Sequence, residues 1–185
     1  TIASTRNLAE RIVHMRDESL TGLAGMAPID FTVASAEHRA EDQTTRVAGT
    51  YVVPSYMTGD GGPGTRLNLG DDHLPVPFTC TVPDSARTEP ARASLYGHGL
   101  LGSGRQANSG YVRAVAHEHN VVFCGTDYLG MAEEDLPTVA TILGDISKFP
   151  QLADRNQQGL LAFHVLGRLM TSADGFVSDP AFQGE

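Results

Sequence analysis

The stretch LYGHGLLGS, from Leu95 to Ser103, most constrains the fold of this chain. The apolar run ARASL before it is typical of a short buried strand that ends at Gly97. Glycines follow at positions 97, 99 and 102, where a missing Cβ lets the backbone turn sharply and approach other groups closely. Helical spacing of apolar residues begins near Tyr111. A strand, a glycine-rich turn and a helix in succession are typical of sites where backbone N–H groups bind negative charge.

Two chemical interpretations compete for this turn. Residues 97–102 read G-x-G-x-x-G, the dinucleotide-binding pattern, with Gly97, Gly99 and Gly102 at its glycines and Asp127 placed as a ribose-binding acid. In that pattern the third glycine opens a helix, whereas here the flexible, polar residues 103–110 intervene. The alternative is the His-Gly loop of an α/β-hydrolase, which donates one backbone N–H to the oxyanion hole. A plain connecting turn without chemistry is the third interpretation.

Composition excludes several classes of function. The net charge of −9 and the pI near 5.1 argue against nucleic acid or an anionic membrane as the main partner. No apolar run is long enough to span a membrane, and no signal peptide is visible. The 185 residues suffice for one sizeable core or for part of a larger domain.

The chain before the turn predicts a helix and then antiparallel strands. An amphipathic helix is expected from Thr1 to Thr21, within an N-terminal segment of residues 1–28. Strands are expected around Phe31 and Val33, over 46–53, and over 76–82, where Pro77 places the start of the strand near an edge. Asp60, Asp71 and Asp72 of the intervening loop do not have the spacing of an EF-hand, so they are expected to be solvated turn residues and no metal site is predicted.

After the turn the pattern becomes strand, helix, strand. A helix from about Tyr111 to Asn120 leads into the continuous apolar run 121–124, which is typical of a strand covered on both faces. One crossover helix implies a parallel strand pair. Cys124 is therefore expected to be a buried free thiol, with a bridge to Cys80 as the alternative if the protein is secreted.

The loop after this strand, residues 125–135, should meet the turn at the same edge of the sheet. Tyr128, Leu129 and Met131 could then line an apolar substrate pocket beside Leu100 and Leu101. The acids at 133–135 precede a helix, where the helix dipole accounts for them. That helix has Pro137 in its first turn and is expected to end at Phe149–Pro150. The expected apolar stripe of that helix is Val139, Ile142, Leu143 and Ile146.

A last helix is expected to begin at Asp154 as its cap and to run to about Met170. The tail, 171–185, is polar and turn-like, with Phe176 and Phe182 as its large anchors.

Three motifs carry a resemblance to a known family. In order they are YGHGLLGS at 96–103, FCGTDYLGM at 123–131 and ADRNQQG at 153–159. Together they resemble an uncharacterised group of α/β-hydrolase-like proteins from actinobacteria and other bacteria, which look like lipases and esterases and are usually predicted to be exported. The resemblance covers most of the chain.

The resemblance implies roles for particular residues. The Gly99–Leu100 loop would be the oxyanion loop, with the Leu100 N–H as donor, and His98 would shape the turn behind it. In the superfamily a Ser elbow, an acid and a His follow later in the chain. No Gly-x-Ser-x-Gly occurs in this sequence, so the resemblance implies that the nucleophile lies beyond these residues.

The prediction is thus an α/β fold: the N-terminal part of an α/β-hydrolase sheet, with antiparallel strands leading into a parallel βαβ unit over residues 29–185. The predicted function is hydrolysis of a small-molecule ester, with no cofactor, no metal and no nucleic-acid partner, in a protein exported in its full-length form. The alternatives are a Rossmann-type NAD-binding oxidoreductase and a non-catalytic, hydrolase-like binding module. The pattern indicates no oligomeric state.

Overall fold

The computed structural model describes residues 9–19, 29–59, 61 and 73–183. Residues 9–19 form a helix inside the predicted N-terminal one, and its Met15 is buried in the core. The predicted ends of that helix, at Thr1 and Thr21, lie outside the described residues. None of the helices in the described part of the chain is long and apolar enough to cross a membrane.

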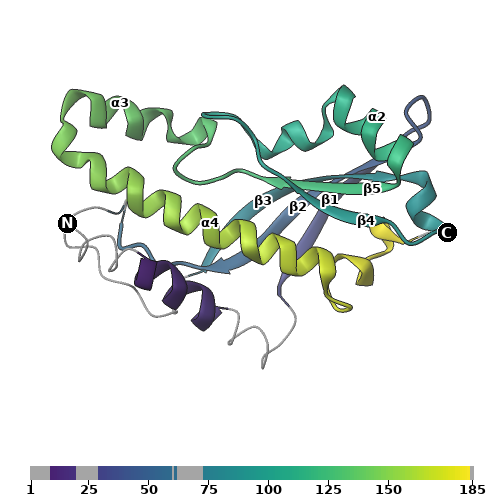
Figure 1. Cartoon of the computed structure of the whole chain (residues 1–185), viewed down its shortest axis with the longest axis horizontal. Helices are drawn as coiled ribbons and strands as arrows, with labels where there is room; N and C mark the ends of the chain where they lie inside the picture. The colour runs from purple at the N-terminus through teal and green to yellow at the C-terminus, as the bar shows by residue number, and fades with distance from the viewer. Residues whose placement is uncertain (1–8, 20–28, 60, 62–72, 184–185) are drawn as a thin grey trace.

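A five-stranded sheet organises the fold (Figure 1). The strand order is β1-β2-β3-β5-β4, antiparallel throughout except for the parallel pair of β4 and β5. This confirms the predicted α/β class, with antiparallel strands leading into a parallel βαβ unit. The strands are β1 (Phe31–Arg39), β2 (Thr44–Pro54), β3 (His73–Pro83), β4 (Arg92–Tyr96) and β5 (Val121–Thr126).

Strand β3 is central in the sheet, but its start, which the sequence places near an edge because of Pro77, has a partner on one side only. It pairs with β2 along its whole length, but with β5 only from Phe78 onward. The proline therefore lies just outside the second ladder, where its missing N–H costs no hydrogen bond.

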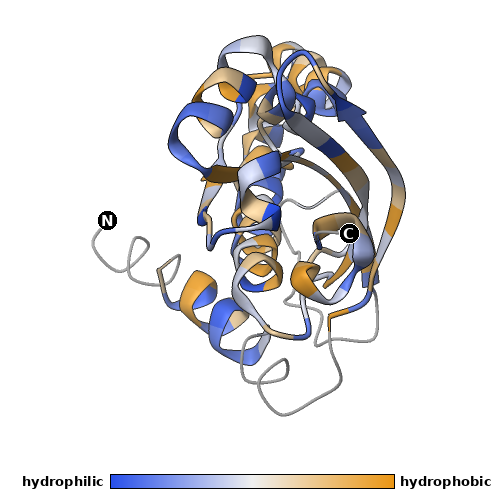
Figure 2. Ribbon diagram, turned by 90° about the vertical axis from the view of Figure 1, so that its right-hand side faces the viewer, coloured by the Kyte–Doolittle hydropathy of each residue, from blue (hydrophilic) through white to orange (hydrophobic). Residues whose placement is uncertain are grey.

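Helices cover both faces of the sheet. The helices are α2 (Gly110–His119), α3 (Leu136–Gly144) and α4 (Phe149–Thr171). Helix α4 packs Val165, Leu166 and Leu169 against the alternate strand residues Val47 and Phe78, in the main core. Half-buried and exposed residues alternate along most of the edge strand β1, as expected of a strand with one face toward the core, and the strands carry both hydrophobic and hydrophilic residues (Figure 2). Helix α2 and the short 3₁₀ helix η2 (Gly104–Asn108) lie on the opposite face (Figure 1).

Two predicted anchors of the C-terminal segment are confirmed. Phe176 is buried, and its ring stacks on that of Phe182 with centroids 4.6 Å apart. Asn120 ends α2 in the left-handed conformation, with φ of 50°, as its position in the sequence suggested.

The cysteines overturn one prediction. Cys80 of β3 and Cys124 of β5 are register partners across the antiparallel pair and form a disulfide. The expectation of a free thiol at Cys124 is wrong, and the alternative of a bridge holds. The reason is register, which places the two side chains opposite each other on the same face.

The boundary between α3 and α4 also differs from the prediction. Pro150 lies in the first turn of α4 instead of ending the preceding helix, because the first turn has no need of the proline N–H. Asp154 is consequently inside α4, where its carboxylate accepts a hydrogen bond from Arg11 at 3.3 Å. The expected apolar stripe is largely exposed: Ile142 is buried, but Leu143 is 79% and Ile146 72% exposed.

Candidate functional site

The candidate site lies where β4 and β5 end. Because the two strands are parallel neighbours, the turn after Tyr96 and the loop after Thr126 emerge at the same edge of the sheet. Their backbones are joined directly. The Leu101 N–H donates to the Met131 carbonyl at 2.7 Å, and the Glu133 N–H donates to the Gly102 carbonyl at 2.8 Å.

Residues 99–102 form a tight turn closed by a hydrogen bond from the Gly102 N–H to the Gly99 carbonyl at 2.9 Å. Leu101, the third residue of the turn, has φ of 54°, in the left-handed region that leucine rarely adopts. At the tip, the N–H groups of Gly99 and Leu100 form no hydrogen bond with any residue that the structure describes. The Leu100 side chain is 75% exposed.

His98 supports the turn from behind. Its imidazole is largely buried, and Nε2 accepts the Tyr128 N–H at 2.8 Å. Nε2 is therefore unprotonated, and Nδ1 carries the hydrogen that it donates to the Gly99 carbonyl at 2.7 Å. A neutral imidazole with this tautomer joins the two loops.

The four predicted pocket residues are brought together only in part. Leu101 and Met131 meet through their backbones, and Tyr128 packs its ring 6.1 Å from that of Phe163 in α4. Burial raises the pKa of the Tyr128 phenol. Leu129 lines a cavity of about 100 Å³ together with Asp127, Glu134 and residues of β3 and α4.

Sequence reasoning missed the residue that anchors the second loop. Asp135 is completely buried, and its Oδ2 accepts the N–H groups of Gly130 at 2.6 Å and Ala132 at 2.9 Å. Its Oδ1 accepts a hydrogen bond from Arg155 Nε of α4 at 2.6 Å. Three consecutive acids at 133–135 are the only trace of this role in the sequence, and there the dipole of the following helix accounts for all three equally well.

Gly159 of α4 is not among the predicted site residues. A Cβ at this position would lie 2.4 Å from the Leu129 carbonyl oxygen, so only glycine lets α4 approach the loop this closely. The motif at 153–159 therefore packs α4 against the candidate site.

The acid of the dinucleotide interpretation has another use. Asp127 Oδ1 accepts the Ser103 hydroxyl at 2.9 Å and the Gly104 N–H at 2.7 Å. Helix α2 begins only at Gly110, and the short 3₁₀ helix η2 lies between it and Gly102, so the last glycine of the pattern does not open an α-helix. Gly97, Gly99 and Gly102 thus lack the setting that a pyrophosphate requires.

Ser103 is not arranged as a nucleophile beside a histidine base, because its hydroxyl donates its hydrogen bond to Asp127. Among the serines that the structure describes, none forms a hydrogen bond with a histidine. In the same part of the chain, no group of three or more His, Cys, Asp or Glu side chains could hold a metal ion.

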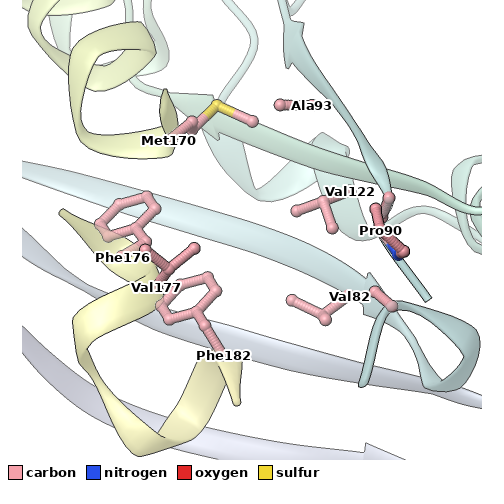
Figure 3. Close-up of a pocket in the computed structure, with 10 residues that line it drawn as sticks. Val82, Pro90, Ala93, Val122, Met170, Phe176, Val177 and Phe182 are labelled. Atoms are coloured by element: carbon pink, nitrogen blue, oxygen red, sulfur yellow. The ribbon is translucent and has the colours of Figure 1, made fainter. Parts of the chain in front are cut away.

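Two larger hollows lie near the sheet. One, of about 270 Å³, is next to the candidate site and is lined by Gly104, Arg105 and Asp127 with residues of β1 to β3. The other, of about 300 Å³, is apolar and is lined by Val122, Met170 and Phe182 among others (Figure 3). Since Ala91, Ala93 and Val122 are at the starts of β4 and β5, this apolar cavity lies at the opposite end of the strands from the turn.

No protein-family model matches the sequence, and no curated protein matches it. Among solved structures, the chain is similar to the crystal structure of a "putative acetyl xylan esterase" from Bacteroides fragilis, with 13% identity and a TM-score of 0.46. The similarity covers 92% of this chain and 45% of that protein, so the chain spans less than half of its length.

Proposed function

We propose that this chain is the oxyanion-loop portion of a serine-type ester hydrolase. The N–H groups of Gly99 and Leu100 would donate to the negatively charged oxygen of the tetrahedral intermediate. His98 would position the turn, and Leu101, Tyr128, Leu129 and Met131 would form the pocket wall. The nucleophilic serine, its acid and its histidine would be supplied by residues outside this sequence.

One observation carries the proposal. The Leu101 N–H donates a hydrogen bond to the Met131 carbonyl, and the Gly102 N–H donates one to the Gly99 carbonyl. The N–H groups of Gly99 and Leu100, at the tip of the turn, have no hydrogen-bond partner among the described residues. Oxyanion stabilisation needs donors that are fixed in advance and uncommitted in the resting protein. The two N–H groups at the tip are uncommitted, and the hydrogen bonds on either side of them hold the turn in place.

The two hydrogen bonds of the neutral His98 ring also support a role for the turn in binding an oxyanion. A charged imidazole would attract an oxyanion by itself, but this imidazole accepts the Tyr128 N–H and so acts through the backbone it holds. The chemistry of the loop would therefore lie in main-chain donors instead of side chains.

Export of the full-length protein is part of the proposal. The Cys80–Cys124 bridge supports it, since structural disulfides persist mainly in oxidising compartments.

The test compares two substitutions at one position in the full-length gene product. Leu100→Pro removes the donor, because proline has no N–H, and is expected to lower turnover of p-nitrophenyl acetate by about 10²–10³. Leu100→Ala keeps the donor and should lower turnover only modestly. Circular dichroism and thermal melts establish that both variants are folded.

The opposite pattern would refute the assignment. If folded Leu100→Pro retains wild-type turnover while alanine at His98 or Asp127 abolishes it, the chemistry lies in side chains. A full-length protein that binds esters but turns none over would favour the non-catalytic binding module. Saturable NADH binding abolished by Asp127→Ala would favour the oxidoreductase.

A further inference from the structure

The turn at 99–102 does not hold its shape alone. Leu101 adopts φ of 54°, a conformation in which its Cβ crowds the following carbonyl. Such a conformation persists only when surrounding contacts impose it. The closing bond from Gly102 to Gly99 is compatible with several turn types, so it does not impose this one.

The contacts that hold Leu101 in this conformation come from the neighbouring loop, residues 125–135. The Met131 carbonyl accepts the Leu101 N–H, and the Gly102 carbonyl accepts the Glu133 N–H. The first bond fixes the Leu100–Leu101 peptide plane, and the second fixes the Gly102–Ser103 plane, where the chain leaves the turn. The loop thus holds the turn on the C-terminal side of the Leu100 N–H.

The loop is in turn held by one carboxylate. Asp135 binds the amides of Gly130 and Ala132, which bracket Met131, and so sets the position of the Met131 carbonyl. Arg155 fixes the carboxylate through an ion pair in which Arg155 is 13% and Asp135 0% exposed in their side chains. A buried carboxylate with three charge-assisted bonds has one orientation available.

We propose that Asp135, oriented by Arg155, is the positioning residue of the oxyanion turn. It acts in sequence through the 130–132 backbone, the Met131 carbonyl and the Leu101 N–H. The inference rests on the proposed function for the purpose of the turn, but the chain of contacts stands on the geometry alone.

Asp135→Asn is the direct test. One amide oxygen can still accept the two backbone N–H groups, but the side-chain NH₂ then faces Arg155 Nε, donor against donor. We expect the Leu101 and Glu133 amides to exchange at least about tenfold faster in hydrogen–deuterium exchange followed by NMR. Amides at the centre of β2 and β3 should keep their wild-type rates.

Glu133→Gln is the matched control. It removes the same charge two residues away, from a carboxylate that pairs with Arg105 at the surface. Its backbone bond to Gly102 is unaffected by the substitution. Wild-type exchange is therefore expected at Leu101. Wild-type exchange at Leu101 in folded Asp135→Asn, or an equal increase in Glu133→Gln, overturns the proposal.

Arg155→Lys keeps the test decisive if Asp135→Asn does not fold. Lysine preserves the charge but not the Nε geometry, so a smaller increase confined to the Leu101 and Glu133 amides is expected. Unchanged rates in Arg155→Lys then overturn the proposal.

A kinetic measurement separates positioning from general support. In the full-length gene product, Asp135→Asn should lower kcat about tenfold with KM unchanged, because the turn would contact the transition state more than the substrate. An increase in KM alone contradicts the positioning role. If the wild-type protein hydrolyses no ester, the proposed function fails, while the exchange rates still decide whether Asp135 sets the turn.

Discussion

Three neighbouring acids show how strongly the environment separates similar residues. Glu133 pairs with Arg105 at the surface, Asp135 is buried, and Glu134 lies between them. Partial burial raises the pKa of the Glu134 carboxyl, and the charges of Asp135 and Asp127 raise it further. A pKa raised on folding means that ionised Glu134 destabilises the fold above its folded pKa. The penalty vanishes below the unfolded value of about 4.3.

Glu134→Gln should therefore stabilise the protein at pH 7. The gain in free energy of unfolding should be below about 1 kcal/mol, because solvent screens much of the interaction. It should shrink as the pH falls towards about 4, where the wild-type carboxyl is protonated. Urea denaturation at both pH values measures this, with Glu133→Gln as the variant expected to show no gain. A gain that persists at pH 4 would contradict the electrostatic cause.

At the scale of single residues, the sequence predicts where a turn lies better than it predicts which side chains are in contact. The glycine spacing was enough to place a sharp turn at 97–102, with His98 beside it. The tautomer of His98 and the burial of Asp135 were out of reach. Both depend on the relative placement of two loops that are about 30 residues apart in the chain, such as His98 and Tyr128.

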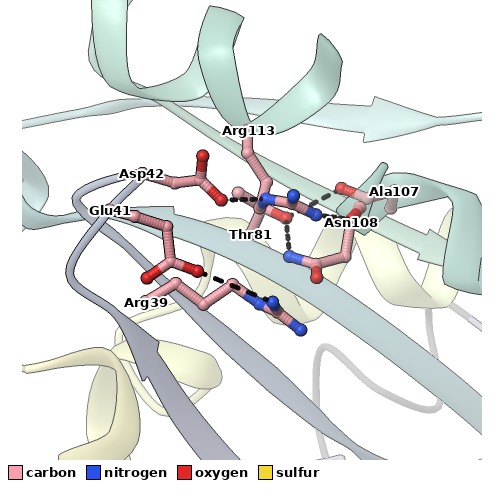
Figure 4. A network of polar contacts seen from close by, with 7 residues as sticks. All are labelled: Arg39, Glu41, Asp42, Thr81, Ala107, Asn108 and Arg113. Atoms are coloured by element: carbon pink, nitrogen blue, oxygen red, sulfur yellow. Dashed lines mark hydrogen bonds and ion pairs between the residues drawn. The ribbon is translucent and has the colours of Figure 1, made fainter. Parts of the chain in front are cut away.

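At the scale of elements, a polar network joins the β1–β2 turn to helix α2 (Figure 4). Arg113 donates to Asp42 at 2.5 Å and to the Asn108 carbonyl at 2.7 Å. Asn108 continues the network to Thr81 of β3 at 2.6 Å. The network ties α2 to the β1–β2 turn and to β3, and so holds the helix over the sheet.

We expect Asp42→Ala and Arg113→Ala to be coupled by about 1–2 kcal/mol in a double-mutant cycle. Urea denaturation of the two single variants and the double variant measures the coupling. Glu41→Ala is the control from the same turn. Its carboxylate is 4.0 Å from Arg39 and 70% exposed, so a change within about 0.5 kcal/mol is expected. Additive effects of Asp42 and Arg113 would show that their contact contributes no stability.

Element types were predictable because periodicity determines them locally. The strands around Phe31, over 46–53 and over 76–82, and the β4–α2–β5 unit, were each visible in the apolar spacing. The α3–α4 boundary was wrong because a proline can end one helix or begin the next. The bond between Asp42 and Arg113 spans 71 positions and leaves no local trace in the sequence.

At the scale of the whole molecule, the strand order brings the two loops of the candidate site together. β4 and β5 are parallel neighbours, so the turn and the 127–135 loop share one edge. The same order places Cys80 opposite Cys124. The parallel pair was predictable from its crossover helix, whereas the cysteine pairing required the register of β3 on β5, for which the sequence has no marker.

Residues 1–185 alone should show no turnover of p-nitrophenyl esters. The described part of the chain has no serine bonded to a histidine, and the sequence has no Gly-x-Ser-x-Gly. Without a nucleophile and a base, oxyanion donors leave only a small residual rate over water, far below that of a complete site. The assay compares the folded chain with a heat-denatured sample and with Ser103→Ala, which removes the hydroxyl nearest the turn. Turnover that survives repurification and disappears in folded Ser103→Ala would place the nucleophile within this chain and end the proposal that it lies elsewhere.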